Sequence, residues 1–290
     1  MMLLCKTRGL AIVALTMASV LLLTGSGGAA DQPGRFVDLP NVRLWITDSG
    51  GPGDVVVLLH PTTGTSAIWQ DVVPLFVDAG FRVLAPDKPG WGKSVVRTGQ
   101  EPISLTENLD LLLDRLGVAQ INLVGVANGG YAALDFAAWR PERVRKLVIA
   151  ASGLGVKGDA EGEAFRKRAA IPNFASLPPE VREMSPSYRG LHPDRVAAWK
   201  AIEENAKQAG AVEPPLRTPN TIDKLTALKV PLLILAGDVD LTTPSGAIRL
   251  WTRHLKEPYQ WVLIPEAGHA LAWEQPAVFS RTVISFLNEQ

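Results

Sequence analysis

The sequence predicts an α/β fold with a mostly parallel central sheet, flanked by helices, and a helical segment inserted late in the chain. Continuous apolar runs such as Val55–Leu59 alternate with amphipathic helical stretches. This is the pattern of βαβ units whose strands are buried on both faces. The stretch at 154–229 instead is charged, broken by prolines and without a strand pattern. We therefore divide the chain into a core at 31–153 and 230–290 and a helical cap at 154–229.

The composition is that of an ordinary globular protein, with 290 residues, 47% hydrophobic and 20% charged. The formal net charge is zero. Without residues 1–30 the chain loses Lys6 and Arg8, so 27 of its 29 basic residues remain against 29 acidic ones, a net charge of −2. No basic cluster stands out, so we expect no nucleic-acid partner.

The N-terminus predicts an export signal at residues 1–30. Lys6 and Arg8 precede an apolar stretch at 10–23, and small residues then lead to a cleavage site after Ala30. A membrane anchor is the alternative, but this apolar stretch is shorter than the ~20 residues of a bilayer span. We expect an exported protein, periplasmic or secreted, with no stable membrane anchor once the signal is removed. Cys5, the single cysteine, lies within this segment, so no disulfide is expected in the mature chain.

The strands are predicted from apolar patterning. The first two alternate in polarity, as an antiparallel hairpin does, and the later ones are continuous apolar runs that fit a buried parallel sheet. The predicted strands are Arg35–Leu39, Val42–Asp48, Val55–Leu59, Phe81–Ala85, a run from Ile121, Leu147–Ala150, Val230–Ala236 and Tyr259–Ile264.

The helices are predicted from helical periodicity and from their start and stop signals. Ser104 and Glu107 form a capping box before a leucine-rich helix that Gly117 ends. Pro276, at a first helical position, opens the last helix. The other predicted helices are Ile68–Ala79, Tyr131–Trp139, Gly162–Ala170, Asp194–Ala209 and Ser245–Leu255.

Residues 121–130 have the pattern of a nucleophile elbow. The apolar run Ile121–Val126 leads into a glycine-rich turn, and a helix follows at once. Gly125 and Gly129 flank the tip of this turn, where a strained backbone requires small neighbours. The residue at the tip is Ala127, whose methyl group cannot attack a carbonyl carbon.

An acid and a base follow the last two strands in the order that accompanies this elbow. Asp240 lies in the loop after Val230–Ala236, with Asp238 as the second choice for the acid and a turn role as the alternative for both. His269 lies between the last strand and the last helix, where it could take a proton from a nucleophile while Asp240 orients it.

Together these motifs resemble the α/β-hydrolase fold family, from residue 35 to the C-terminus. The resemblance implies a Ser-His-Asp triad in which Ala127 replaces the serine. It also implies an oxyanion hole from the backbone N–H groups of Thr62 and Asn128. The sequence departs from the family at Pro61, which follows His60 where the family usually has glycine.

We expect a small ester-type substrate with an apolar or aromatic acyl group, because aromatic residues occur in the cap and in the core loops. No metal or other cofactor is expected, since the sequence has neither ligand pairs of histidine or cysteine nor a phosphate loop. The residues expected to line the substrate pocket are His60, Thr63, Trp91, Tyr188, Trp199 and Trp273.

Three hypotheses about function follow. The first is an exported serine hydrolase, most simply a carboxylesterase that forms an acyl-enzyme, which is inactive as written because Ala127 replaces the nucleophile. Amide, lactone and carbon–carbon bond hydrolysis use the same groups and stay open. The second is a natural relative without a nucleophile that serves as a binding protein. The third is a relative of epoxide hydrolases or haloalkane dehalogenases whose aspartate nucleophile has been replaced.

Overall fold

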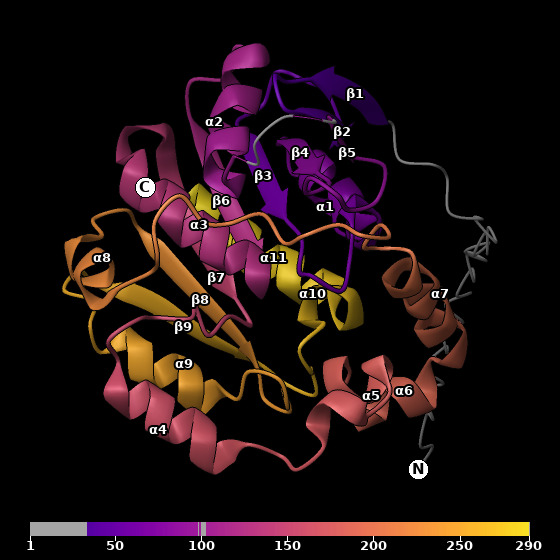
Figure 1. Ribbon diagram of the computed structural model, residues 1–290, viewed down its shortest axis with the longest axis vertical. Coiled ribbons are helices and arrows are strands. Elements are labelled where there is room, and N and C mark those ends of the chain that lie inside the picture. The colour runs from indigo at the N-terminus through magenta and orange to yellow at the C-terminus, as the bar shows by residue number, and fades with distance from the viewer. Residues whose placement is uncertain (1–33, 98, 100–102, 290) are drawn as a thin grey trace, which may run out of the picture. The chain divides into compact units, whose positions relative to one another are not determined.

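The computed structural model describes residues 34–97, 99 and 103–289 (Figure 1). The export signal predicted at 1–30 lies outside these residues and stays a prediction. Within the described ranges, no helix has both the length and the apolar character that a bilayer crossing requires.

The sheet is mostly parallel, as predicted. Among the described residues nine strands pair in the order β1-β2-β4-β3-β6-β7-β8-β9, and β5 pairs with β2. The strands β1, β2 and β5 are antiparallel to their neighbours, and every pair from β4 to β9 along this order is parallel. The strands are β1 (Gly34–Asp38), β2 (Val42–Asp48), β3 (Val55–Leu59), β4 (Arg82–Pro86), β5 (Val95–Val96), β6 (Ile121–Val126), β7 (Val144–Ala150), β8 (Leu232–Gly237) and β9 (Tyr259–Ile264).

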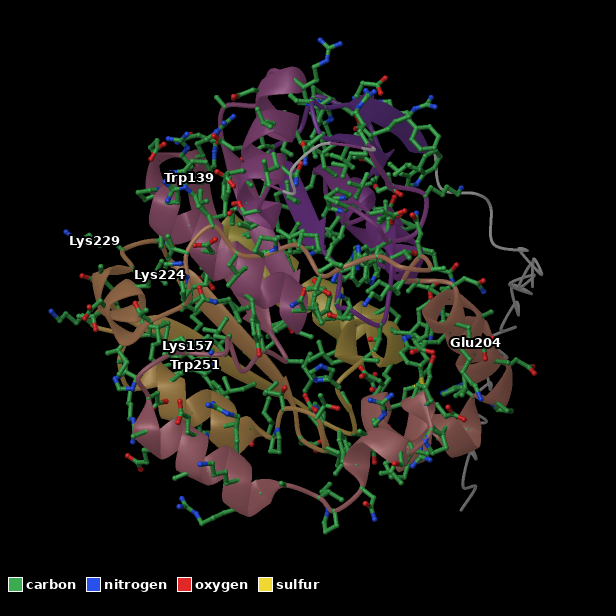
Figure 2. All side chains as sticks on the ribbon, in the orientation of Figure 1. Trp139, Lys157, Glu204, Lys224, Lys229 and Trp251 are labelled. Atoms are coloured by element: carbon green, nitrogen blue, oxygen red, sulfur yellow. The ribbon has the colours of Figure 1, made fainter. Side chains whose placement is uncertain are left out.

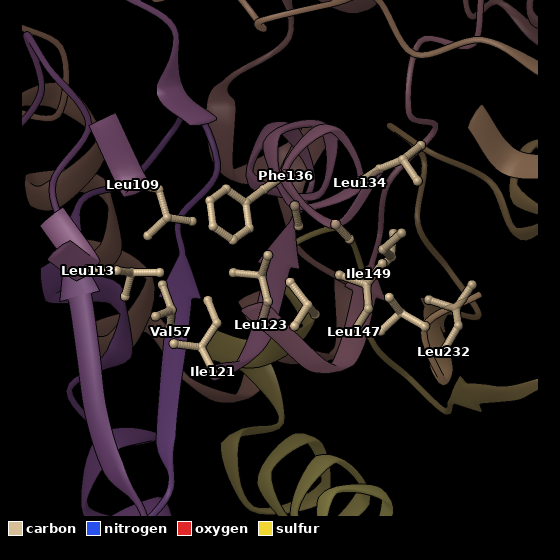
Figure 3. Close-up of a cluster of buried hydrophobic side chains, with 14 of the residues drawn as sticks. Val57, Leu109, Leu113, Ile121, Leu123, Leu134, Phe136, Leu147, Ile149 and Leu232 are labelled. Atoms are coloured by element: carbon tan, nitrogen blue, oxygen red, sulfur yellow. The ribbon is translucent and has the colours of Figure 1, made fainter. Parts of the chain in front are cut away.

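Helices cover both faces of the sheet (Figure 1). One face packs against α2 (Leu105–Arg115), α3 (Asn128–Trp139) and α9 (Ser245–Thr252), and Figure 3 shows part of this apolar cluster, with Phe136 above Leu123. The other face packs against α1 (Val73–Asp78) and α11 (Pro276–Asn288). Because both faces are covered, the central strands are largely buried and rich in apolar residues, which explains the apolar runs in the sequence.

The helix predicted at Ile68–Ala79 is two elements. A 3-10 turn at Ser66–Trp69 is followed by the separate helix α1. Pro74 stands in the first turn of α1. Because proline has no N–H and clashes with the preceding turn, it starts a helix here instead of continuing one.

Five helices and a 3-10 turn occupy the described region between β7 and β8, where a helical cap was expected (Figure 1). Prolines stand at the starts of α5, α6 and α7, so the residues that break the pattern in the sequence begin new helices. We call residues 154–229 the cap segment. Its helices are α4 (Ala160–Ala169), α5 (Pro179–Glu183), α6 (Pro186–Leu191), α7 (Pro193–Glu204) and α8 (Ile222–Ala227).

The two ends of the cap segment are fastened to each other and to the core. A bridge joins Lys157 to Thr221, and the Asn220 amide donates to the carbonyls of Leu154 and Tyr131. Lys224, labelled with Lys157 in Figure 2, forms an ion pair with the buried Asp135 of α3. The segment therefore leaves and re-enters the core beside the helix that follows the elbow.

Candidate active site

Ala127 has the strained backbone expected at the tip of a nucleophile elbow. It lies between β6 and α3 with φ 51° and ψ −115°, a conformation that residues with a Cβ rarely adopt. Its N–H donates to the Ala150 carbonyl at 2.9 Å, and its own carbonyl accepts from the Ser152 hydroxyl at 2.7 Å and from the Gly130 N–H at 3.0 Å. These bonds hold a conformation whose strain costs about 1–3 kcal/mol.

The glycines around Ala127 are required by close backbone approach. A Cβ on Gly125 would lie 2.4 Å from the Gly129 carbonyl oxygen, and one on Gly129 would lie 2.2 Å from the Leu59 carbonyl oxygen. A Cβ on Gly130 would lie 2.7 Å from the Ser152 hydroxyl. Helix α3 therefore packs directly against β6 and the end of β3, which brings Ala127 to the edge of the sheet.

The acid and the base predicted from the sequence are hydrogen-bonded to each other. His269 Nδ1 lies 2.8 Å from Asp240 Oδ2, and both side chains are buried. The other carboxylate oxygen, Asp240 Oδ1, accepts from the backbone N–H groups of Thr242 at 2.8 Å and Thr243 at 2.7 Å. Asp238, the second choice, is exposed. The loop after β8 therefore presents Asp240, and not Asp238, to the imidazole.

His269 holds its proton strongly. Burial disfavours the imidazolium, but the carboxylates of Asp240, Glu183 and Glu274 outweigh it and raise the pKa of His269 to about 9. Glu274 also fixes the backbone next to His269 through hydrogen bonds. Its carboxylate accepts from the N–H groups of Gly268 and Ser185, each at 2.8 Å.

The loop predicted to form the oxyanion hole is held in place by hydrogen bonds of Trp91 and His60. The Trp91 indole N–H donates to the Thr62 carbonyl at 2.9 Å. The His60 Nε2 accepts from the Lys88 N–H at 3.0 Å, and its Nδ1 lies 2.7 Å from the Pro61 carbonyl oxygen. Burial, together with the nearby Lys88 ammonium, lowers the pKa of His60 to about 3, so its ring is neutral and Nδ1 is the donor.

Lys88 links this loop to the elbow. Its buried ammonium lies 3.2 Å from Asn128 Oδ1, 2.7 Å from Glu213 Oε1 and 4.1 Å above the Trp91 ring. Burial lowers the pKa of Lys88 to about 8, although Glu213 opposes this shift. One cation of the core therefore contacts the residue after the elbow tip and a residue of the cap segment.

A cavity of about 300 Å³ opens over Ala127. Ala127, His269, Thr62, Thr63 and Asn128 line it, so the structure brings five of the predicted site residues together. Its other lining residues are Pro61, Tyr131, Ala151, Gly153, Glu183, Thr242 and Thr243.

Apart from Thr63, which lines the cavity over Ala127, the predicted pocket residues divide into three groups. Trp199 and Trp273 line a small adjoining cavity that also contacts Thr63 and His269. Tyr188 is buried against the ring of His192 and is absent from the described lining of either cavity.

His60 and Trp91 were expected in the pocket and instead lie behind the loop of Thr62. Neither is among the lining residues described for the cavity over Ala127, and both residue types suit a pocket and a buried support equally well. Their side chains are 1% and 0% exposed, and they hold the loop through hydrogen bonds.

The sequence analysis missed Glu183 and Lys88, which lie close to the site. Glu183 stands in a charged, proline-broken stretch where nothing marks it out, and it is 5% exposed beside His269. Lys88 follows Asp87 in a loop rich in glycine and proline, where nothing in the sequence marks it out. No set of three or more potential metal ligands is gathered anywhere in the described parts of the chain.

The comparisons with known proteins agree on the family. The sequence model of the family described as "Alpha/beta hydrolase family" matches residues 56–282. A 2-hydroxy-6-oxononadienedioate/2-hydroxy-6-oxononatrienedioate hydrolase of Burkholderia vietnamiensis is 29% identical over 86% of this chain and 92% of its own length. A 2-hydroxy-6-oxo-6-phenylhexa-2,4-dienoate hydrolase of Comamonas testosteroni is 28% identical over 84% and 91%, respectively.

Among solved structures, a thermophilic esterase from Thermogutta terrifontis with malate bound is similar over 87% of this chain and 98% of that one. The TM-score is 0.69 and the sequence identity 26%.

Proposed function

This chain belongs to the alpha/beta hydrolase family, and from that premise we propose that its site is that of a serine ester hydrolase with Ala127 at the nucleophile position. In this proposal the chain as written binds small esters without turning them over, and a serine at position 127 makes it an esterase. The proposal includes export of the mature protein, as the N-terminal signal pattern predicts.

The observation that carries the proposal is the strained turn at Ala127 beside the hydrogen-bonded pair of His269 and Asp240. Strain of this kind persists only where the surroundings enforce it, and it is concentrated at functional sites. A chain that merely needed to connect β6 to α3 would have no use for a positive φ at an alanine. In this proposal the turn presents the side chain of residue 127 to the cavity, and here that side chain is a methyl group without a nucleophilic atom.

The catalytic steps follow from the groups that line the cavity. A serine Oγ at position 127 attacks the ester carbonyl carbon, and the neutral form of His269 takes its proton. The resulting oxyanion is held by the backbone N–H groups of Thr62 and Asn128. The imidazolium then protonates the leaving alkoxide, and a water molecule repeats the sequence on the acyl-enzyme to release the acid and restore the serine.

The direct test is Ala127→Ser, with turnover of p-nitrophenyl acetate and butyrate measured beside the chain as written. We expect activity only with the serine, at least ~10³-fold above the alanine form, because the nucleophile is the part of such a triad that cannot be bypassed. Ala127→Ser combined with His269→Gln is the control and should be inactive.

The same series separates the other two hypotheses. If Ala127→Ser is inactive while ester analogues still bind, the chain is a binding protein. If Ala127→Asp, and not Ala127→Ser, gives turnover of epoxides or haloalkanes, the site belongs to a hydrolase with an aspartate nucleophile.

A second candidate reaction is supported by the cavity next to the site. It has a volume of about 480 Å³, it shares Tyr131, Gly153, Thr242 and Thr243 with the cavity over Ala127, and Lys157 and Arg166 stand among its lining residues. The dienoate named for the Comamonas testosteroni relative carries its carboxylate at carbon 1 and its ketone at carbon 6. A ketone over Ala127 would place such a carboxylate toward these two cations.

Hydrolysis of that molecule, which contains no ester or amide, breaks a carbon–carbon bond. The test is to assay 2-hydroxy-6-oxo-6-phenylhexa-2,4-dienoate with the Ala127→Ser chain and with a further Arg166→Gln change. Turnover that depends on Arg166 favours this reaction, and ester turnover alone favours the first.

A further inference from the structure

Glu183 is a buried carboxyl group that the proposed catalytic steps leave without a role. It lies at the end of α5 in the cap segment, it is 5% exposed, and it lines both the cavity over Ala127 and the small cavity beside it. His269 lines the same two cavities. The polar contact recorded for its side chain is with the Thr63 hydroxyl, at 3.5 Å from Oε2.

The backbone around Glu183 is attached to the loops that carry the acid and the base. The Glu183 carbonyl accepts from the Ala270 N–H at 2.7 Å, and the Arg182 carbonyl accepts from the Thr242 hydroxyl at 2.9 Å. A Cβ on Gly268 would lie 2.8 Å from the Glu183 carbonyl oxygen. The cap segment is therefore seated on the two catalytic loops, which fixes the Glu183 side chain relative to His269.

His269 is surrounded by acids. Asp240 bonds Nδ1, Glu183 stands on the side of the cavity, and Glu274 braces the backbone below. The charged groups that also act on Glu183 are Arg182 of its own helix and Glu203 of α7. Burial raises the pKa of Glu183, and the positive charge of His269 opposes this, so the two groups stabilise each other in the charged form.

We propose that Glu183 is a positioning residue that the cap segment contributes to the site, where it holds the proton on His269 from the side of the cavity. Asp240 orients the ring through Nδ1, while Glu183 acts on the face where the substrate and position 127 lie. The catalytic part of this inference rests on the proposed esterase function. The effect of Glu183 on the pKa of His269 is independent of that function.

The consequence for catalysis concerns the pH at which His269 can act as a base. Only the neutral ring can take a proton from a serine at position 127. A second carboxylate keeps the ring protonated to higher pH, which moves the acid limb of the rate profile toward alkaline pH. Removing the charge of Glu183 should therefore release His269 as a base at lower pH.

The test is an NMR titration of the histidine ring protons in the chain as written and in Glu183→Gln. His269→Gln identifies the signal of this ring among the four histidines. We expect the pKa of His269 to fall by about one unit in Glu183→Gln, the usual effect of losing a nearby carboxylate. Glu180→Gln on the same helix is the matched control, because Glu180 pairs with Lys200, and it should leave the titration unchanged.

A pKa of His269 that stays the same in Glu183→Gln overturns the proposal. Glu183→Met is the second variant, in case the amide fails to fold, and the same fall is expected from it. In the Ala127→Ser background, Glu183→Gln should move the acid limb of kcat/KM to lower pH, and Glu180→Gln should not. If Ala127→Ser is inactive on every ester but the titration moves as stated, the esterase proposal fails and the assignment of Glu183 stands.

Discussion

His269 and Asp240 are joined by a hydrogen bond of 2.8 Å in a site whose third position is an alanine. Both side chains are buried, and Asp240 receives two further backbone hydrogen bonds from Thr242 and Thr243. An aspartate that only shaped the turn could accept those two bonds without contacting the histidine. The third contact, with His269, is the one on which the proposed reaction depends.

Replacement of Asp240 should therefore be costly once a nucleophile is present. In the Ala127→Ser chain, Asp240→Asn should lower kcat about 10⁴-fold, because the amide favours the wrong tautomer and cannot stabilise the imidazolium. The measurement is p-nitrophenyl ester turnover at saturating substrate. Asp238→Asn, two residues away and exposed, is the matched control, and equal losses in both variants would contradict the assignment of the acid.

Trp91 should affect the rate without touching the substrate. Trp91→Phe keeps most of the ring over which Lys88 lies but removes the N–H that holds the Thr62 carbonyl. We expect kcat in the Ala127→Ser chain to fall about tenfold with little change in KM, as a buried carbonyl left without its partner costs about 1–3 kcal/mol and the loop relaxes. Trp45→Phe serves as the control, because Trp45 of β2 also lies under a lysine ammonium, that of Lys93. An unchanged kcat in Trp91→Phe would show that Thr62 is held by other contacts.

The elbow glycines should be structural requirements even in the inactive chain. Gly125→Ala should lower the free energy of unfolding by about 3 kcal/mol, since its Cβ would lie 2.4 Å from the Gly129 carbonyl oxygen. Gly190→Ala has nothing within 4 Å of the added atom, and as a helical site it should be neutral or stabilising by up to ~1 kcal/mol. Urea denaturation measures both. A tolerated Gly125→Ala would mean that α3 can move away from β6.

Asp48 gives the fold a stabilising contribution that depends on pH. Burial opposes its ionisation, but hydrogen bonds from Arg82, Gly50 and Arg35 outweigh burial and lower the pKa of Asp48 to about 2. A group whose folded pKa is depressed stabilises the protein above its unfolded pKa, so this contribution is present above pH 3.8 and is lost as the pH falls toward 2.

Asp48→Asn should therefore reduce the free energy of unfolding by about 1 kcal/mol at pH 7, a value that allows for the partial exposure of the pair. The difference from the parent should disappear near pH 2. Denaturant titrations at pH 7, 5 and 3 follow this change, and Asp54→Asn, in the exposed pair with Arg145, should have no measurable effect. A constant difference across this range would assign the effect of Asp48 to packing.

The core of the fold and the pairing of Asp240 with His269 could be predicted from the sequence because both leave short-range patterns. β3 was predicted at the bounds observed, since a strand buried on both faces is a continuous apolar run. The bounds of β9 were also predicted from its apolar residues, although this edge strand is partly exposed. Asp240 and His269 follow their strands directly, where parallel strands bring successive loops to one edge. Short elements such as β5 and α10 (Leu271–Glu274) were missed, because two to four residues carry no period.

The supports of the site could not be predicted in the same way. Glu183 comes from the cap segment and lines the same two cavities as His269, and the chain between them includes two strands, so no spacing in the sequence indicates this proximity. Lys88 and Trp91 become supports through contacts that form only on folding, Lys88 with Glu213 and Trp91 with the Thr62 carbonyl. Their sequence neighbourhood, rich in glycine, predicts only a loop.

The seating of the cap segment on Gly268 and Ala270 has a consequence for any attempt to graft substrate preference from a relative. A cap transplanted whole would bring new pocket walls, but it would also remove the carbonyl of Glu183 to which the Ala270 N–H donates and the backbone that packs on Gly268. The histidine loop would then have to find another support. In this chain the cap segment and the loop that carries His269 support each other through backbone contacts, so the one cannot be exchanged without disturbing the other.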